Sequence, residues 1–200
     1  MTNDNMWGGT IRKLWPMEAD KFRDHLLRLD ANSRRMRFAH AVSDSFIVDY
    51  AKRMSENGSI VYAYMDGDRV GAVAELRKIG DTWGHQAEAA FSVEDEYRQK
   101  GIATELLGRV IRSARNRGVS NLIMSCLADN AKMQAVARHH DATLHFEQGE
   151  VIGEISPDGA NPMSIFAEAV EDRMGYLLAI FDLRKPQVAA QPKALPSKAA

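Results

Sequence analysis

The chain has 200 residues, of which 45% are hydrophobic and 26% are charged, and its formal net charge is −1. This composition indicates a single folded domain and excludes an intrinsically disordered chain. A net charge so close to zero gives no sign of nucleic-acid or membrane binding, so any site for an anion must be local. Only one cysteine, Cys126, is present, the N-terminus has no signal-peptide pattern, and no apolar run approaches the ~18 residues that a bilayer requires. We therefore expect a cytoplasmic protein.

Three strands joined by two short turns dominate the first half of the chain. Ahead of them, residues 1–9 are polar and predict a flexible N-terminus, and Pro16 suits the first turn of a helix. The run Asp66-Gly67-Asp68 is typical of a hairpin turn. We expect an antiparallel meander, preceded by one strand and two helices. The predicted segments are a strand at 10–15, a helix from residue 16, a second helix from 43–45 to 57, and strands at 59–65, 69–79 and about 85–93.

From residue 101 the alternating pattern gives way to helical spacing. Ile102, Leu106 and Val110 recur on one face of a helix that Gly118 ends. The short apolar run at 121–127 is typical of a buried strand in parallel pairing. The remaining predicted segments are a helix at 130–140, a hairpin at 142–146 and 151–155, and a loop at 156–161.

Beyond this loop, an apolar stripe at helical spacing predicts a long helix. The stripe consists of Ile165, Phe166, Ala169, Val170, Met174, Leu177, Leu178 and Phe181. We expect this stripe to cover the sheet. Contact with a second copy of the chain is the alternative, and residues 177–183 also fit a strand. Residues 184–200 contain three prolines and predict a disordered tail. The expected organisation is a single domain at 10–183, with its core at 10–155 and a C-terminal extension at 156–183.

Residues 91–104 predict an anion site. A strand ends there, a short charged turn follows, and a helix begins at Gly101 and Ala103. The first N–H groups of a helix have no internal partner, and the helix dipole favours an anion at this end. Gly101 lets a phosphate approach the backbone because any Cβ would fill the space, and Arg98 and Lys100 add positive charge. The segment fits neither a Walker loop nor the three-glycine dinucleotide fingerprint. A plain helix start between two surface cations is the alternative.

The order of the predicted elements and two motifs resemble the GNAT family of N-acetyltransferases. The acyl-CoA loop of this family reads Arg/Gln-x-x-Gly-x-Gly/Ala, and the loop after the fourth predicted strand reads Arg-Gln-Lys-Gly-Ile-Ala at 98–103. The family's Asn just after the fifth strand corresponds to Asn130. The resemblance covers about residues 10–155. It implies an α/β fold with a mixed, mostly antiparallel central sheet flanked by helices.

A narrower resemblance is to the acetyltransferase domain of bacterial Pat-type protein lysine acetyltransferases. It depends on the pattern at 32–38 and on Ala87-Glu88-Ala89 in the fourth predicted strand. In such domains a glutamate of the fourth strand is the general base, and this glutamate corresponds to Glu88. The resemblance therefore implies a catalytic role for Glu88. An outward-facing glutamate on a half-exposed strand is the alternative.

The family resemblance also implies acetyl-CoA as co-substrate and no metal. In the family the fourth and fifth strands part and expose the thioester, while the loop amides hold the pyrophosphate. The implied reaction is direct attack by a primary amine, of a protein lysine or a small molecule, in a ternary complex. The residues expected to bind the cofactor are Phe91, Ser92, Val93, Arg98, Gln99, Lys100, Gly101, Ile102, Ala103, Thr104 and Asn130.

The chain departs from the family at Ala137. Many members carry a tyrosine at this position, seven residues after the Asn, which protonates the departing CoA thiolate. Tyr50 and Tyr97 are the nearest alternatives in type. The departure keeps a second function open, a non-catalytic acyl-CoA sensor that regulates a partner. A structural dimerisation module that binds no CoA is a third interpretation.

Other conspicuous residues have plainer interpretations. His139 and His140 point about 100° apart on a helix, so they are poor metal co-ligands and we expect surface histidines. Cys126 lies in an apolar strand and predicts an inert core thiol. The arginines at 34–37 fit a phosphate or acidic-partner site and a solvated helix edge equally well. The acidic residues at 94–96 predict a solvated turn.

Overall fold

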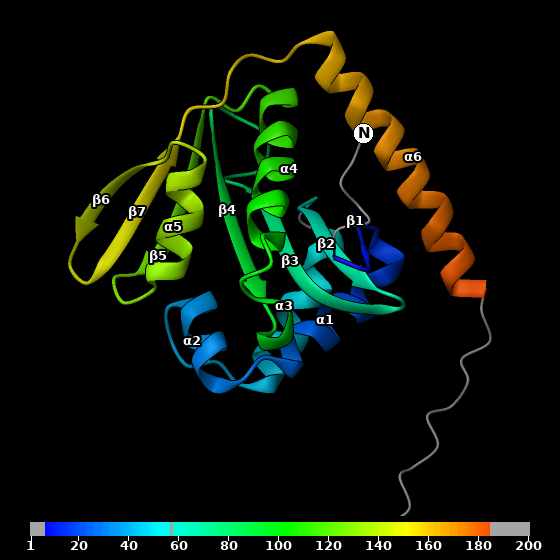
Figure 1. Ribbon diagram of the computed structural model, residues 1–200, viewed down its shortest axis with the longest axis horizontal. Coiled ribbons are helices and arrows are strands. Elements are labelled where there is room, and N and C mark those ends of the chain that lie inside the picture. The colour runs from blue at the N-terminus through cyan, green and yellow to red at the C-terminus, as the bar shows by residue number, and fades with distance from the viewer. Residues whose placement is uncertain (1–6, 57, 185–200) are drawn as a thin grey trace, which may run out of the picture.

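The fold of the chain is built on one seven-stranded sheet with helices on both faces (Figure 1). The computed structural model describes residues 7–56 and 58–184, so the predictions for residues 1–6 and 185–200 lie outside the described residues. The strand order is β1-β2-β3-β4-β5-β7-β6. Neighbouring strands pair antiparallel, except that β4 and β5 run parallel. This arrangement confirms the mixed, mostly antiparallel α/β fold.

The strands begin and end within one residue of the predicted bounds. Alternating or continuous apolar runs placed most of them correctly, because β1 to β5 and β7 have side chains in the core, whereas β6 at the edge of the sheet is largely exposed. Their bounds are β1 Thr10–Leu14, β2 Ile60–Asp66, β3 Arg69–Lys78, β4 Gln86–Val93, β5 Asn121–Leu127, β6 Thr143–Glu147 and β7 Glu150–Ile155.

One helix was not predicted. Asp30 caps it, since its carboxylate accepts hydrogen bonds from the N–H groups of Asn32 and Ser33 at 2.9 and 3.0 Å. The helix is short and polar, and Ser33 is its one buried residue, so it has no apolar stripe that a sequence pattern can show. The helices are α1 Ala19–Arg28, α2 Ala31–Phe38, α3 Asp44–Glu56, α4 Ile102–Asn116, α5 Ala131–His139 and α6 Pro162–Arg184, with 3-10 turns at Pro16–Glu18 and Asp95–Tyr97.

Two apolar layers hold the helices to the sheet. One lies between the sheet and α4 and α5, and the other lies between the sheet and α1 and α3. The side chains of β4 alternate between the two faces of the sheet. Ala87, Ala89 and Phe91 face the layer under α4. Glu88 and Ser92 face the opposite side, where α1 to α3 lie.

The pairing of β4 with β5 is unusually short. It joins residues 86–88 to residues 121–123, although β4 continues to Val93 and β5 to Leu127. In the described part of the chain, the rest of this edge of β4 has no strand beside it. The two strands therefore part just after Glu88, as the family resemblance implies.

The predicted C-terminal helix is α6, so the alternative strand at 177–183 is wrong. α6 lies along β1, at one edge of the sheet, and against α4 (Figure 1). The predicted apolar stripe is exposed, so the expectation that it covers the sheet is also wrong. Among the described helices, none combines the length and the apolar character that crossing a bilayer requires.

Candidate active site

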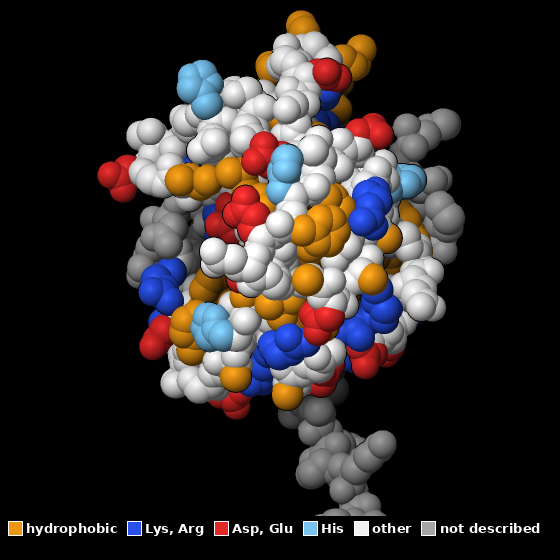
Figure 2. All heavy atoms as spheres, turned by 90° about the vertical axis from the view of Figure 1, so that its left-hand side faces the viewer, with side chains coloured by type: hydrophobic (Ala, Val, Ile, Leu, Met, Phe, Trp, Pro, Cys, Tyr) orange, Lys and Arg blue, Asp and Glu red, His pale blue; other side chains and the backbone are white. Residues whose placement is uncertain are grey.

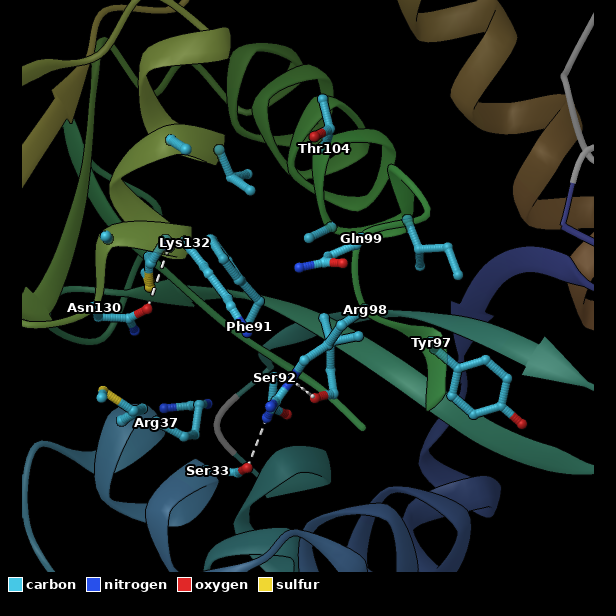
Figure 3. Close-up of a pocket in the computed structure, with 18 of the residues that line it drawn as sticks. Ser33, Arg37, Phe91, Ser92, Tyr97, Arg98, Gln99, Thr104, Asn130 and Lys132 are labelled. Atoms are coloured by element: carbon cyan, nitrogen blue, oxygen red, sulfur yellow. Dashed lines mark hydrogen bonds between the residues drawn. The ribbon is translucent and has the colours of Figure 1, made fainter. Parts of the chain in front are cut away.

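The parting of β4 and β5 opens a cavity of about 600 Å³, here called the β4–β5 cavity. Four segments line it: the end of β4, the loop and first turn of α4, the start of α5, and α2. Figure 3 shows Gln99 of the loop, Asn130 of α5, and Ser33 and Arg37 of α2 around this space. Of the residues expected to bind the cofactor, all except Lys100 line the cavity.

The predicted anion site at the start of α4 depends on backbone conformation. Gly101 has φ +80°, in the left-handed region that glycine adopts without strain. A Cβ at Gly101 would meet no protein atom within 4 Å, so its steric role concerns a ligand in the cavity and not the protein. The next three residues, 102–104, line the cavity, and their N–H groups belong to the first helical turn. These features make this end of the cavity suited to a phosphate.

Arg98 stabilises the loop through its own contacts. Its Nε donates to the carbonyl oxygen of Val93 at 3.2 Å, its Nη2 donates to Ser33 Oγ at 2.7 Å, and its Nη1 pairs with Asp95 (Figure 3). The guanidinium thus ties α2 to the loop. The Nζ of Lys100 lies 5.4 Å from the centroid of the Tyr97 ring, outside the cavity lining.

Asn130 caps α5. Its Oδ1 accepts a hydrogen bond from the N–H of Met133 at 3.2 Å, so the side chain orients the first turn of α5. Asn130 and Lys132 both line the cavity. The N-terminal ends of α4 and α5 therefore meet at the same space, and both favour negative charge.

Glu88 lies in the last pair of residues before β4 and β5 part, and it does not line the cavity. Its side chain is 37% exposed, and its carboxylate pairs with Arg77 on β3. Arg77 Nη1 also donates to Tyr50 Oη at 3.2 Å, and Tyr50 donates to Glu75 at 2.7 Å. Glu75 in turn pairs with Arg37, which lines the cavity. A polar chain that the sequence did not predict thus runs from Glu88 to the cavity wall.

Neighbouring groups set the protonation states of Arg37 and Tyr50 in this series of polar contacts. Burial alone would lower the pKa of Arg37, but Glu75 and Tyr50 raise it above its usual value. Burial, together with the charge of Glu75, raises the pKa of Tyr50 to about 12. Arg37 therefore stays a cation and Tyr50 stays protonated over the whole neutral range.

A second polar cluster lies behind the end of β4. His25 is fully buried, and its Nε2 lies 2.9 Å from Ser92 Oγ while its Nδ1 lies 3.0 Å from Glu94 Oε1. Burial lowers the pKa of His25. Burial opposes ionisation of Glu94, but hydrogen bonds from His25, Arg28 and Arg69 lower its pKa to about 2. Glu94 is buried, so the prediction that it belongs to a solvated turn is wrong.

Ala137 is buried in the core, and the hydroxyl groups of both alternative tyrosines are already hydrogen-bonded to other side chains. The Tyr50 hydroxyl is engaged with Glu75. The Tyr97 hydroxyl donates to Asp66 at 2.9 Å and points away from the cavity (Figure 3). Burial and the bond to Asp66 raise the pKa of Tyr97 to about 12.

The remaining conspicuous side chains serve the fold. The Cys126 thiol is buried, which raises its pKa and confirms the prediction of a core thiol. His140 Nε2 lies 2.8 Å from the carbonyl oxygen of Thr104 and so joins α5 to α4. Arg35 pairs with Asp129 at 2.7 Å, which links α2 to the segment before α5. Within residues 7–56 and 58–184, no group of three or more His, Cys, Asp or Glu side chains is placed to hold a metal ion.

Comparison with known proteins agrees with this geometry. The family model described as acetyltransferase (GNAT) family matches residues 23–141. The chain belongs to this family. The predicted membership of the GNAT family is therefore confirmed.

Solved structures with the same fold include a Pat-type protein. The GNAT domain of Streptomyces lividans PAT matches with a TM-score of 0.64 and 23% identity over 74% of this chain and 90% of that one. The yncA protein of Salmonella typhimurium, solved with acetyl-CoA, matches with a TM-score of 0.56 and 16% identity over 78% and 98% of the two chains. The cAMP-binding acyltransferase of Mycobacterium smegmatis matches with a TM-score of 0.56 and 22% identity over 82% of this chain, which spans 50% of that one. These matches confirm the resemblance to Pat-type domains at the level of the fold.

Proposed function

We propose that the chain transfers an acetyl group from acetyl-CoA to a primary amine by direct attack in a ternary complex. The observation that carries the proposal is the β4–β5 cavity, with two helix N-termini at one end and Glu88 beside the point where the strands part. From Glu88 to Val93, β4 extends about 16 Å at 3.3 Å per residue. An elongated cofactor along this edge would therefore connect an anion site at α4 to a base at the strand junction.

The cofactor would be held mainly by backbone groups. The N–H groups of the first turn of α4 would bind the pyrophosphate, as helix N-termini bind anions. The unpaired edge of β4 at 91–93 would pair with the pantetheine arm as a further strand does. Asn130 would contact the same arm from α5. Two proteins with this fold, yncA and the phosphinothricin acetyltransferase of Sinorhizobium meliloti, have been solved with acetyl-CoA, which supports this choice of ligand.

Glu88 would act as general base. The amine nitrogen attacks the thioester carbonyl carbon, Glu88 accepts the amine proton through a water, and CoA departs as a thiolate. Arg77 holds the carboxylate in position from β3, so we regard it as a positioning residue. A thiol ionises near pH 8.5, so a thiolate can depart without a tyrosine at position 137.

The acceptor would reach the thioester from the side of α2. This helix contributes Asn32, Met36 and Arg37 to the cavity wall, and these residues were not among the predicted site residues. Under this proposal the acceptor amine belongs either to a protein lysine or to a small molecule.

Release of free thiol from acetyl-CoA tests the proposal. The chain is incubated with acetyl-CoA and a panel of amines that includes lysine-containing peptides, polyamines and amino sugars. Amine-dependent thiol release is the expected result, and a new N-acetyl group on the amine identifies the acceptor.

The second candidate is an acyl-CoA sensor without catalytic activity. Its support is the ion pair that already engages Glu88 and the alanine at position 137. Binding of acetyl-CoA without thiol release on any amine favours the sensor. If the chain were a purely structural module, acetyl-CoA would not raise its melting temperature.

A further inference from the structure

Helix α6 has its charged side turned inward and its apolar side turned outward. Its buried positions include Ser164, Glu168, Gly175 and Ala179, whereas large apolar side chains are exposed along its length. A helix on the surface of a globular protein ordinarily buries its apolar stripe. The inverted arrangement of α6 therefore needs an explanation.

The inward side is held by specific contacts. Glu168 accepts hydrogen bonds from Ser113 at 2.7 Å, Asn116 at 2.6 Å and Arg117 at 2.7 Å, all at the C-terminal end of α4. Further along, Asp172 pairs with Lys13 on β1 at 3.0 Å. These contacts fix the rotation of α6 about its own axis, because the acidic side chains must face α4 and β1.

The close approach of α6 to β1 fixes the same rotation. A Cβ at Gly175 would lie 3.5 Å from Arg12 Cβ, so the helix backbone packs directly on the strand. Trp15 meets Tyr176 edge-on, with ring centroids 5.1 Å apart. These contacts therefore fix the orientation of α6, with its apolar side turned toward solvent.

The outward face is large enough to form an interface. Seven large apolar side chains on this face of α6 are between 40% and 74% exposed. At about half of the ~150–250 Å² of a large side chain each, they present on the order of 700 Å². The largest apolar patch of a typical monomer is about 300–600 Å², and each partner in a standard interface buries about 800 Å². The seven residues are Met163, Phe166, Val170, Met174, Leu177, Leu178 and Phe181.

We propose that this face of α6 is a homodimer interface, in which the α6 helices of two copies of the chain pack against each other. The central residues recur at spacings of three and four, as in helices that pair along a seam. These seam residues are Met163, Phe166, Val170, Met174, Leu177 and Phe181.

The charge of the face favours a second copy as the occupant. Two identical faces bring like charges together, and like-charge contact is costly. Among the described side chains of α6, Arg173 is the one exposed charge. The enrichment of Phe and Met with few charges is also typical of the core of homodimer interfaces.

A lipid surface fits this helix less well. Interfacial membrane helices carry Lys and Arg on the polar side, where these residues meet anionic lipid. The polar side of α6 is acidic and is turned into the molecule, where Glu168, Glu171 and Asp172 are paired.

Outside α6, the exposed large hydrophobic side chains of the described residues are Met17, Ile79 and Phe146, which lie in or next to separate elements. Figure 2 shows the side of the molecule away from α6, where acidic, basic and hydrophobic side chains are intermixed. Phe146 on β6 is one exposed aromatic residue outside α6, at 65%, nearly the same exposed fraction as the 66% of Phe166. Phe146 therefore provides a matched control for Phe166.

Sedimentation velocity of the full chain at ~1 to 100 μM tests the proposal. We expect a dimer of twice the 22.3 kDa chain mass. Phe166→Glu should raise the dimer dissociation constant at least about thirtyfold, as loss of a central interface residue does. Phe146→Glu should leave it unchanged. The far-ultraviolet circular dichroism of both variants shows whether they are folded.

A second measurement locates the interface without disturbing it. Cys126 is buried, so a cysteine introduced by Arg173→Cys, near the middle of α6, takes donor and acceptor dyes selectively. Packed helices lie about 8–10 Å apart, so mixed subunits should show strong energy transfer that unlabelled chain competes away.

Three results would overturn the proposal. One is a wild-type chain that stays monomeric at 100 μM, whether or not it binds phospholipid vesicles. Another is a dimer that Phe166→Glu and Phe146→Glu leave equally intact. The third is a dimer whose subunits labelled at position 173 show no energy transfer. None of these results depends on catalysis, so they do not bear on acetyl transfer.

Discussion

The β4–β5 cavity and helix α6 distribute polar and apolar groups in opposite ways. Beside the cavity, the apolar side chains Ala87, Ala89 and Phe91 of β4 belong to the core, whereas the charged side chain of Glu88 is 37% exposed. At α6, acidic side chains face the body of the protein and apolar side chains face solvent. The cavity thus follows the usual rule of burial, and α6 reverses it.

The reversal has a local cause. α4 presents Arg109, Arg112 and Arg117 on the side that α6 approaches, and Glu171 and Glu168 meet them. Cations that a helix covers need acidic partners, because an unpaired buried charge is strongly destabilising. An apolar stripe placed on these arginines would take away the carboxylates of Glu168 and Glu171. Which side of a helix is buried therefore depends on what it packs against.

The largest expected effect is catalytic and tests the cavity. Glu88→Gln should lower the rate of acetyl transfer by about 10²- to 10⁴-fold, the usual contribution of a general base, with acetyl-CoA affinity unchanged. Thiol-release kinetics and isothermal titration calorimetry measure the two quantities. Glu147→Gln, on the exposed strand β6, is the matched control. Unchanged turnover in Glu88→Gln would remove this residue from the mechanism.

Two substitutions in α6 test its orientation. Glu168→Ala should lower the free energy of unfolding by about 3 kcal/mol, since it leaves the contacts of Arg117, Asn116 and Ser113 unfilled. Phe166→Ala should change the stability of the dilute, monomeric chain by less than about 0.5 kcal/mol, as exposed substitutions do. Urea denaturation gives both values. The sequence pattern alone predicts the reverse order, so the reverse result would contradict the inverted helix.

Acidification tests the buried cluster behind the cavity. The unfolded chain binds a proton at His25 below about pH 6.5 and the folded chain does not, because burial lowers this pKa. Stability should therefore fall as the pH drops below 6.5. Glu94 contributes fully above pH 4.5, and up to about 3 kcal/mol is lost as the pH falls from there toward its folded pKa of about 2.

Denaturation at pH 7.5, 5.5 and 3.5 separates the two steps. His25→Gln should be less stable at pH 7.5 but should lose much less between pH 7.5 and 5.5. Glu168 also has a lowered pKa, so α6 adds to the loss of stability at low pH. The loss of stability between pH 7.5 and 5.5 is expected to come from His25, behind the cavity. If His25→Gln lost as much stability as the wild-type chain between pH 7.5 and 5.5, this loss would belong to groups other than His25.

The smallest effect concerns Gly101. Gly101→Ala should weaken acetyl-CoA binding about tenfold, because Gly101 lines the cavity where the proposed cofactor binds and the left-handed φ costs about 1 kcal/mol. Gly67 also has a positive φ and open space around it, in the turn between β2 and β3. Gly67→Ala should show a similar loss of stability with unchanged binding. Equal binding in both variants would remove the loop from the cofactor site.

Most strands and helices could be predicted from the sequence because their signals are local. Period-two alternation, helical spacing and turn residues placed β2 to β5 and α4 within one or two residues. The loop at 98–103 and Asn130 were also found from sequence, through a family motif whose residues act by backbone conformation and capping.

The parts that could not be predicted depend on partners distant in the sequence. α2 has no apolar stripe, so its place in the cavity wall follows from contacts such as Arg98 with Ser33. The pairing of Glu88 with Arg77 requires the register of β3 and β4. Glu94 has the sequence context of a solvated turn, but it is buried where His25 and Arg28 of α1 and Arg69 of β3 meet its carboxylate.

By itself, the sequence determined the strands, the helices other than α2, the family resemblance, and a loop whose glycine and helix start favour an anion. Tertiary structure alone decided three further features: that β4 and β5 part just after Glu88, that Glu88 pairs with Arg77, and that α6 turns its apolar face outward. The physical reason is the range of the interactions. Backbone conformation and capping act between near neighbours, whereas ion pairs and burial depend on which surfaces the fold brings together.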